Sequence, residues 1–271
     1  MSNPLTASPV PPPGVLACPA CGAILDIAPD LITCPDCGTV FPQHSGFIDL
    51  ASGQRLSSTT GLGPLLLSHP LQVARYEDLT RVAFLEVAAA NWAPALTPTD
   101  EFRYLREHAS AASGPILDIA CGAGRWTKAL ADKFGESRII GLDLSTAMLE
   151  AARQTLPESV LIRASALSLP FADSSLGAAN CSAAFQIMPD PPGLLMEVGR
   201  CLQPGGTFTL ATLTRARRPV QRYFQRRQED AFSTRSYDPK VVAEWLTAAG
   251  LKIVDQYDPA CFLLLTAVKV G

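Results

Sequence analysis

The sequence predicts an α/β fold, in which a Rossmann-like, doubly wound parallel sheet carries helices on both faces. After residues 113–114, short apolar segments alternate with segments of helical periodicity to the end of the chain, which is the pattern of parallel strands joined by crossover helices. The apolar segment 116–120 ends in a turn of small residues that opens a helix, and segment 139–143 ends in an acid. Strand, tight turn and helix in this order form the ligand-binding end of such a sheet.

The elements of this domain follow from the spacing of its apolar residues. Trp126, Leu130 and Phe134 recur at helical spacing after the first turn, and the strand segments are short and apolar. The last two strands are expected to form an antiparallel pair. The predicted strands are residues 116–120, 138–143, 160–164, 176–182, 207–213, 251–257 and 261–270, and the predicted helices begin at Arg125 and Ser145 and cover residues 239–249.

The N-terminal part of the chain is predicted to comprise four regions before the α/β domain of residues 113–271. Residues 1–17 are rich in proline, which indicates a disordered leader and not a signal peptide. A cysteine module (18–50), a linker rich in Ser, Thr and Gly (51–68) and a helical lid (69–112) follow.

Two helices are expected in the lid, over the mouth of the ligand site. Pro70 suits the first position of an amphipathic helix over residues 70–91. A second helix is expected over residues 99–108, with Thr99 as its N-cap. Residues 46–50, at the end of the cysteine module, are expected to pair as a strand with the cysteine turns.

Four of the eight cysteines have the spacing of a metal site. Cys18, Cys21, Cys34 and Cys37 form a C-x2-C-x12-C-x2-C array with a glycine after each pair, and each pair can place two thiolates on one tight turn. Four thiolates close a tetrahedron around zinc, so the metal would be structural. A segment this short has too little core to fold alone, which makes a metal a physical requirement.

The alternatives for this array are disulfides, a redox pair or iron. Disulfides and redox pairs need an oxidising compartment or a thioredoxin-like context, which the sequence does not show. Four thiolates also suit iron in a rubredoxin-like site, so that metal stays open. The four remaining cysteines are interpreted as small buried hydrophobic residues.

Composition favours a cytoplasmic enzyme. The chain has 271 residues, of which 48% are hydrophobic, and a formal net charge of −3, so it has material for a large core and no general attraction to polyanions. No apolar run reaches the length of a membrane span. The oligomeric state is not predicted.

The small residues between Asp118 and Arg125 predict a cofactor site. Gly122 and Gly124 allow the backbone to approach a ligand, and the free N–H groups at the helix start favour an anionic group. The carboxylate of Asp143 can accept hydrogen bonds from ribose hydroxyls. A dinucleotide site would have a third glycine, which is missing, and Asp118 suits an ammonium group better than a pyrophosphate. S-adenosylmethionine, an adenosine joined to a zwitterionic amino acid, fits both observations.

At these residues the chain resembles the class I S-adenosylmethionine-dependent methyltransferases, whose first motif reads Leu-Asp-x-Gly-Cys-Gly-x-Gly-Arg. Ala120 departs from that motif, where glycine is commoner. The resemblance implies a seven-stranded sheet of order 3-2-1-4-5-7-6 with the last strand antiparallel. It also implies a set of cofactor-binding residues: Asp118, Ala120, Cys121, Gly122, Gly124, Asp143, Leu144, Met148, Ser165, Ala166 and Ser182.

A second stretch of the family pattern lies at residues 163–175, which resemble a Gly-Asp-Ala-x-x-Leu-Pro-Phe segment. Ser165 replaces the acid that commonly binds the adenine amino group, and one weakened hydrogen bond would cost about 1 kcal/mol. Leu144 and Met148 occupy positions that pack on the adenine, although both also suit a plain core. Ser182 ends the fourth strand, where a backbone carbonyl meets the methionine part.

A narrower resemblance includes the N-terminal half. The order of cysteine module, Asp49-Leu50, a Tyr76-x4-Arg81 segment and the α/β domain is similar to a family of uncharacterised methyltransferases of plant plastids, cyanobacteria and other bacteria. By analogy with lid-carrying methyltransferases, Tyr76 and Arg81 are candidates to bind the cofactor carboxylate. A half-buried tyrosine and a solvated arginine are the plain alternatives.

The methyl acceptor is the least defined part of the prediction. No histidine is placed as a base, and Gln186 stands where related enzymes often carry histidine; it can hold a substrate but cannot accept a proton. Arg218 and Arg222 are candidates to bind an anionic substrate, because six arginines lie between residues 215 and 227. A solvated helix face, partly paired with Glu229 and Asp230, is the alternative for this cluster.

Three functional classes remain, and the third has the least support from the sequence. The favoured one is methylation of a small metabolite that is anionic or a secondary metabolite, because the chain is acidic and its aromatics are not interleaved with basic residues. The second is a ribosomal RNA methyltransferase, since certain rRNA guanine methyltransferases join a zinc module to this fold. The third is a methyltransferase fold that binds the cofactor without transferring a methyl group.

Overall fold

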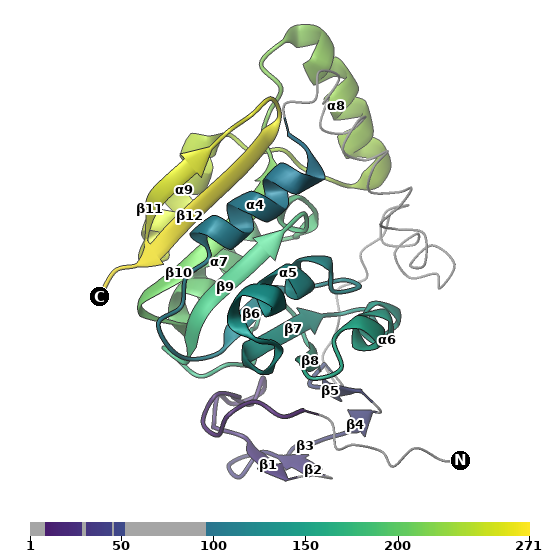
Figure 1. Ribbon diagram of the computed structural model, residues 1–271, viewed down its shortest axis with the longest axis vertical. Coiled ribbons are helices and arrows are strands. Elements are labelled where there is room, and N and C mark those ends of the chain that lie inside the picture. Colours follow the sequence, from purple (N-terminus) through teal and green to yellow (C-terminus); the bar gives the residue numbers. More distant parts are fainter. Residues whose placement is uncertain (1–8, 29–30, 45, 52–95) are drawn as a thin grey trace.

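A nine-stranded sheet forms the centre of the computed structural model, which describes residues 9–28, 31–44, 46–51 and 96–271 (Figure 1). Its middle strands are buried on both faces, as parallel strands between two helix layers are. In the order in which they pair, the strands are β11 (Leu251–Tyr257), β12 (Phe262–Lys269), β10 (Leu202–Leu213), β9 (Leu176–Ser182), β6 (Ile116–Ile119), β7 (Ile139–Asp143), β8 (Val160–Arg163), β5 (Phe47–Asp49) and β4 (Gln43–His44).

The predicted strand order is confirmed. Counted from β6, the strands of the α/β domain lie in the order 3-2-1-4-5-7-6, and β12 runs antiparallel to both β10 and β11. All seven strands predicted for residues 113–271 are present, and β5 and β4 of the N-terminal region extend the sheet beyond β8.

Helices cover both faces of the sheet. On one face lie α4 (Pro98–His108), α5 (Arg125–Phe134) and α6 (Thr146–Thr155), and on the other lie α7 (Pro191–Cys201) and α9 (Pro239–Ala248). Two short 3-10 helices, η3 (Glu136–Arg138) and η4 (Phe185–Ile187), follow α5 and β9. The described helices contain no apolar segment long enough to cross a membrane.

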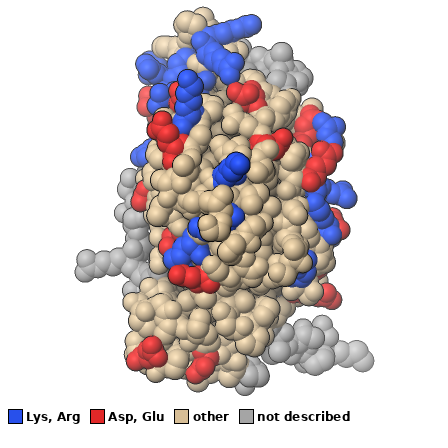
Figure 2. All heavy atoms as spheres, turned by 90° about the vertical axis from the view of Figure 1, so that its left-hand side faces the viewer, with Lys and Arg blue, Asp and Glu red and all other residues tan. Residues whose placement is uncertain are grey.

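Helix α8 (Pro219–Phe232) projects from the top of the molecule in Figure 1. Neither α7 nor α8 was among the predicted elements, although Asp190-Pro191 and Arg218-Pro219 place proline at the first helical turn of each. The end of the molecule that carries α8 is also where many Lys and Arg side chains gather in Figure 2.

Side-chain caps fix the starts of several helices. A helix was predicted to begin at Ser145, and Ser145 is the N-cap of α6, where its hydroxyl accepts a hydrogen bond from the Met148 N–H. The predicted cap Thr99 was wrong, because the helix begins two residues earlier. Thr97 caps α4 in a reciprocal arrangement with Asp100, and Pro98 takes the first helical position.

The expected partner of residues 46–50 was also wrong. Strand β5 pairs in parallel with β8 of the large sheet, with Ile48 opposite Ile162. Burial explains the difference, because Phe47 and Ile48 are nearly inaccessible to solvent and pack with the sheet and α6. The buried Asp49 accepts a hydrogen bond from Arg163 Nη1 at 3.0 Å.

A small three-stranded sheet carries the cysteine module. Its strands β1 (Asp26–Ala28), β2 (Leu31–Thr33) and β3 (Val40–Phe41) are antiparallel. The boundary predicted for the disordered leader was wrong at residues 15–17, which are buried and join this module to residues 169–172. Ala17 N–H donates to the Pro170 carbonyl at 3.0 Å, and Leu16 bridges to Phe171. One contiguous hydrophobic core therefore joins this module to the large sheet.

Only part of the predicted lid lies within the residues that the structure describes. The leader up to residue 8, residues 52–95, and with them the helix over 70–91, Tyr76 and Arg81, lie outside the described residues. Helix α4 packs along the sheet against α5, β10 and β12, and the Tyr104 hydroxyl donates to Asp255 at 2.7 Å. Near its N-terminal end, Glu101 reaches a cavity that Gln186 also lines.

Candidate cofactor site and metal site

The turn after β6 combines three residues in the left-handed backbone region. Ala120 has φ 54°, Gly122 φ 55° and Gly124 φ 90°. This conformation is free for glycine but costs an L-amino acid with a side chain about 1–2 kcal/mol. The backbone angle at Ala120 therefore gives a physical reason why glycine would be preferred there.

Gly124 lies where the turn meets α5. Its left-handed backbone favours glycine, and a side chain there would press on Leu156. A Cβ at this position would lie 2.7 Å from Leu156 Cδ1. Gly124 is the N-cap of α5 and supplies no side-chain hydrogen bond to the helix. The N-terminal end of a helix is suited to bind a carboxylate.

Asp143 closes the turn from the end of β7. Its Oδ2 accepts a hydrogen bond from Gly122 N–H at 2.9 Å, and its Oδ1 accepts one from Ser145 N–H at 2.8 Å. Each carboxylate oxygen can accept a second hydrogen bond. Asp143 thus fixes the glycine turn and the start of α6, with acceptor capacity left for a ligand.

Asp118 lies beneath the turn and is almost fully buried. Its Oδ2 accepts a hydrogen bond from the Thr127 hydroxyl at 2.5 Å, and its Oδ1 accepts one from Asn180 Nδ2 at 2.7 Å. Thr127 belongs to α5 and Asn180 to β9, so one carboxylate joins three elements.

The network continues into β10 through Asn180. The amide oxygen of Asn180 accepts hydrogen bonds from the Ser182 and Thr209 hydroxyls, both at 2.9 Å. The sequence analysis missed Thr127, Asn180 and Thr209. A fully buried asparagine within the apolar strand 176–182 was the available signal, because a buried amide needs partners.

Burial raises the pKa of both acids at the turn. The pKa of Asp118 rises to about 6, mainly by desolvation, and the neighbouring Asp143 charge adds to the rise. Desolvation also raises the pKa of Asp143, while the N–H groups of Ser145 and Gly122 oppose the rise. Two poorly solvated carboxylates that repel each other favour a cationic ligand group.

The other residues expected around the cofactor lie on both sides of the turn. Met148 is buried, with its sulfur 3.9 Å from where a Cβ of Gly122 would be, whereas Leu144 is exposed. The Ser165 hydroxyl accepts the Leu167 N–H at 3.2 Å, next to the buried Ala166.

Cys121 belongs to the core side of the turn. Its side chain is buried in a cluster with Phe47, Leu149 and Leu161. Its sulfur lies 3.1 Å from where a Cβ of Gly141 would be. Desolvation raises the pKa of this thiol well above its usual range, so it is a packed, protonated side chain and not a nucleophile.

The candidate acceptor side of the site is tightly filled. Gln186 is buried, its Nε2 donates to the Ala183 carbonyl at 2.7 Å, and its Oε1 accepts from the Thr212 hydroxyl at 3.3 Å. A cavity of about 10 Å³ beside it is also lined by Glu101 and Phe262. Glu101 is a buried acid that the sequence analysis missed, and no local sequence signal marks it.

The two substrate candidates of the arginine cluster differ in their surroundings. Arg218 is exposed at the start of α8. Arg222 is paired within the chain: its Nη1 donates to Glu229 Oε1 at 2.9 Å, to Gln225 Oε1 at 2.7 Å and to the Ser236 hydroxyl at 3.0 Å. The charge of Arg222 is therefore balanced without a substrate.

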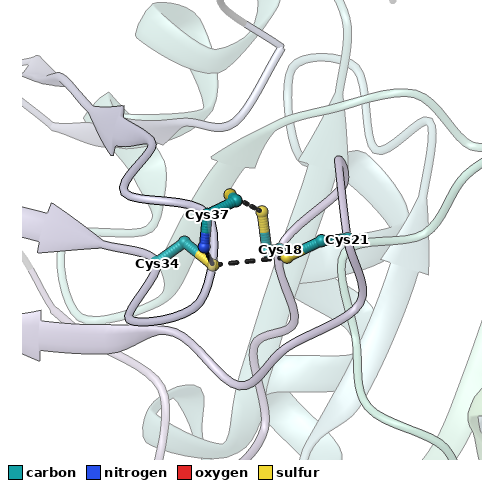
Figure 3. A group of neighbouring side chains, drawn as sticks. All are labelled: Cys18, Cys21, Cys34 and Cys37. Carbon is teal, nitrogen blue, oxygen red and sulfur yellow. Dashed lines mark hydrogen bonds between the residues drawn. The ribbon is translucent and has the colours of Figure 1, made fainter.

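The four cysteines of the N-terminal array converge as expected (Figure 3). All four sulfur atoms lie within 4.8 Å of one another, with Cys18 and Cys37 at 3.7 Å and Cys21 and Cys34 at 3.4 Å. A tetrahedral zinc site with Zn–S bonds of about 2.3 Å separates its sulfurs by about 3.8 Å. The glycines after the pairs, Gly22 and Gly38, have φ 79° and 71°, as the tight turns require.

Comparison with known proteins finds a family model that matches the middle of the chain. The family described as "Methyltransferase domain" matches residues 117–210. An uncharacterized chloroplastic methyltransferase of Arabidopsis thaliana is 27% identical over 239 residues, which are 82% of this chain and 66% of that protein. Demethylmenaquinone methyltransferase of Bacillus licheniformis is 39% identical over 94 residues, 33% of this chain and 40% of that enzyme. The chain thus spans just under two thirds of the first relative and two fifths of the second.

A solved structure supports the fold. Geranyl diphosphate C-methyltransferase of Streptomyces coelicolor, crystallised with Mg²⁺, geranyl diphosphate and S-adenosyl-L-homocysteine, superposes with a TM-score of 0.56. The match has 18% sequence identity and covers 64% of this chain and 77% of that chain. Together the comparisons confirm the resemblance to class I methyltransferases at the level of domain and fold.

The backbone strain at Ala120 predicts a stabilising substitution. Ala120→Gly is expected to raise the free energy of unfolding by about 1 kcal/mol, because glycine adopts the left-handed conformation without steric cost. Urea denaturation would measure the change. Ala123→Gly is the matched control, since Ala123 lies in the same turn without a left-handed backbone and should gain nothing. Equal effects of both substitutions would contradict the strain argument.

The raised pKa of Asp118 predicts a pH-dependent stability. Between about pH 4 and pH 6 the unfolded chain has released the Asp118 proton while the folded chain still holds it. The wild-type protein should therefore lose stability relative to Asp118→Asn as the pH rises through this window, by at most about 3 kcal/mol. Urea denaturation across this pH range would measure it. Asp132→Asn, a change at an exposed acid of α5, controls for the lost charge. If the difference in the free energy of unfolding between the wild type and Asp118→Asn stays constant with pH, the raised pKa of Asp118 is refuted.

Proposed function

Because residues 117–210 form a methyltransferase domain on a class I fold, we propose that this protein is an S-adenosylmethionine-dependent methyltransferase that acts on a small metabolite. The paired carboxylates of Asp118 and Asp143 at the glycine turn carry the proposal. Both are poorly solvated, and the charge of one raises the pKa of the other. A cationic ligand relieves that repulsion, whereas a dinucleotide pyrophosphate would increase it.

Each part of the turn has a role in holding this cofactor. The N-terminal end of α5 would face the cofactor carboxylate, Asp118 would stabilise the ammonium group through the network it anchors, and Asp143 would accept the ribose hydroxyls. Met148 and Ala166 would border the adenine. The bound cofactor supplies the methyl group from its sulfonium, and the protein contributes position and exclusion of water.

Two observations favour an apolar metabolite as the acceptor. The cavity beside Gln186 is lined mostly by apolar residues, and its volume of about 10 Å³ corresponds to about one water molecule, so only the character of its walls bears on the acceptor. In addition, two of the proteins with which the chain was compared act, by their names, on demethylmenaquinone and geranyl diphosphate. An apolar metabolite that enters between α4 and β10 fits these surroundings better than a structured RNA.

We further propose that the four cysteines hold a structural zinc ion and that residues 18–50 form a zinc ribbon. The sulfur separations match a tetrahedral site, and the donor set is closed to water. The ribbon continues into β5, where Asp49 holds Arg163, and Arg163 Nε donates to the Leu144 carbonyl at 3.1 Å. Metal binding would thus stabilise one wall of the cofactor site. The Arabidopsis relative is chloroplastic, and a cytoplasmic location stays a prediction for this chain.

Calorimetry tests the cofactor. S-adenosylmethionine should bind the protein and NAD should not. Asp143→Asn should weaken the binding of S-adenosylmethionine by about tenfold or more, since it removes the charge and one acceptor oxygen. Asp132→Asn should bind like the wild type. Undiminished affinity in Asp143→Asn, measured on protein that unfolds as the wild type does, would exclude the ribose contact, and preferential binding of NAD would exclude the proposed cofactor.

Methyl-labelled cofactor tests the acceptor class. The protein would be incubated with S-adenosylmethionine labelled in its methyl group, once with a small-molecule extract of cells and once with total RNA. Label in the organic-soluble fraction is the expected result. Label in RNA would contradict the small acceptor and favour an RNA methyltransferase. Binding of the cofactor without transfer to either fraction would favour a methyltransferase fold that has lost methyl transfer.

Elemental analysis and thermal unfolding of cysteine variants test the metal. The folded protein should contain one zinc ion per chain, and Cys21→Ser should lose it and unfold at a lower temperature, because metal binding supplies folding free energy. Cys21 is exposed, so its substitution leaves no cavity in the core. Cys261→Ala, which changes a cysteine far from the array in sequence, should keep the metal. Finding iron in place of zinc would change the assignment of the metal. Finding no zinc and no iron in the folded protein would refute the metal site.

A further inference from the structure

Asn180 is a buried amide in the middle of the large sheet. Its strand β9 is buried along its whole length, and in the register of the sheet Asn180 lies directly opposite Asp118 on β6 and Thr209 on β10. Burying an amide costs free energy unless its groups are hydrogen-bonded. An apolar residue of similar size would fill this position without that requirement. The amide therefore indicates a role other than packing.

The hydrogen bonds of Asn180 have one direction. Its Nδ2 donates to Asp118 Oδ1 at 2.7 Å, and its Oδ1 accepts the hydroxyls of Ser182 and Thr209, both at 2.9 Å. The Thr127 hydroxyl donates to the second oxygen of Asp118. An amide nitrogen can only donate, so it favours an ionised carboxyl group as its partner. Desolvation raises the pKa of Asp118, and the hydrogen bonds from Thr127 and Asn180 oppose that rise.

Asn180 also connects the two residues that are expected at the amino-acid half of the cofactor. Asp118 is the acid proposed to stabilise the ammonium group, and Ser182 ends β9, where the resemblance to class I methyltransferases implies a contact with the methionine part. The amide nitrogen holds the first residue and the amide oxygen holds the second. Asp143, the residue expected at the ribose, is held by two backbone N–H groups of the turn and of α6.

We propose that Asn180 is a positioning residue that makes the cofactor site selective for ligands with an ammonium group. This inference rests on the proposed S-adenosylmethionine function. Asn180 orients the carboxylate of Asp118 and favours its ionised form, and that charge attracts an ammonium group at the turn. The adenosine half of the ligand depends on Asp143 and on the residues beside the adenine. Asn180 therefore contributes to binding of the amino-acid half and not of the adenosine half.

Two ligands that differ in the amino-acid half test this role. S-adenosyl-L-homocysteine carries that half, and methylthioadenosine lacks it. Calorimetry on the full chain would give both dissociation constants. Asn180→Leu should weaken the binding of S-adenosyl-L-homocysteine on the order of tenfold, because it removes a hydrogen bond to a charged group. It should leave the binding of methylthioadenosine unchanged.

The ratio of the two dissociation constants separates positioning from a general loss of structure. A fraction of misfolded protein weakens both ligands equally, so it cancels in the ratio. Cys181→Ala is the matched control, since Cys181 is the next residue of β9 and is also fully buried, and it should keep the wild-type ratio. Asp143→Asn should weaken both ligands, because both contain the ribose. Asn180→Ala takes the place of Asn180→Leu if that variant does not fold.

Nuclear magnetic resonance on the wild-type protein gives a readout that needs no substitution at the site. The chain has three asparagines, Asn3, Asn91 and Asn180, so isotope labelling of asparagine gives three pairs of side-chain amide signals. Asn3→Gln and Asn91→Gln identify two of the pairs. The Asn180 pair should move when S-adenosyl-L-homocysteine is added and much less when methylthioadenosine is added, because the ammonium group changes the charge that this amide faces.

The possible results separate this inference from the proposed function. A wild-type protein that binds neither S-adenosylmethionine nor S-adenosyl-L-homocysteine overturns both. Wild-type binding with the same ratio of dissociation constants in the Asn180 variant overturns the role of Asn180 alone, and so does an Asn180 amide signal that moves equally with both ligands. A ratio that falls in the Asn180 variant and stays unchanged in Cys181→Ala supports the inference.

Discussion

The carboxylate of Asp118 is the interaction on which the candidate site depends. It accepts hydrogen bonds from Thr127 on α5 and Asn180 on β9, and through Asn180 it reaches Thr209 on β10. A single buried acid thus sets the positions of the glycine turn and of two neighbouring strand ends. Such a network is costly when any member is missing, because each remaining polar group is then buried without a partner. The burial of this network also raises the pKa of Asp118. A poorly solvated carboxylate of this kind favours a cationic ligand group.

The N-terminal region reaches the candidate site through the pairing of β5 in the large sheet and through the packing of Leu16 and Ala17 on residues 169–172. β5 joins β8 by main-chain pairing, and the ion pair of Asp49 with Arg163 leads directly to the Leu144 carbonyl. On the other side of the cysteine module, Arg200 binds the Leu169 and Phe171 carbonyls and fixes the segment on which Leu16 and Ala17 pack. A metal that orders the cysteine turns would therefore act on the adenine side of the crevice through two routes, each made of a few hydrogen bonds.

Much of this architecture could be predicted from the sequence, and the errors have physical reasons. Strands such as 176–182 are mostly apolar and buried along their whole length, so their number and type follow from the pattern, and the glycine turn carries its own signal. The partner of β5 could not be predicted, because a short apolar strand has no preference between two sheets until their burial is known. The network around Asp118 needed residues 62 positions apart, Asp118 and Asn180, to be brought together by the fold. Thr97 could have been found, since Thr-Pro with an acid three residues later is a capping signal.

The structure of α8 changes the premise on which the acceptor was judged. The absence of interleaved aromatic and basic residues favoured a small metabolite over RNA, but Tyr223 and Phe224 stand between Arg222 and Arg226, so that premise is wrong for this helix. The preference for a small metabolite then rests on the acidic composition of the chain. Helix α8 is nevertheless joined to the Gln186 side of the site, since the Gln186 carbonyl accepts the Arg235 N–H and the adjacent Ser236 bonds to Arg222 of that helix. A substitution in α8 can therefore change the surroundings of Gln186 through these few hydrogen bonds.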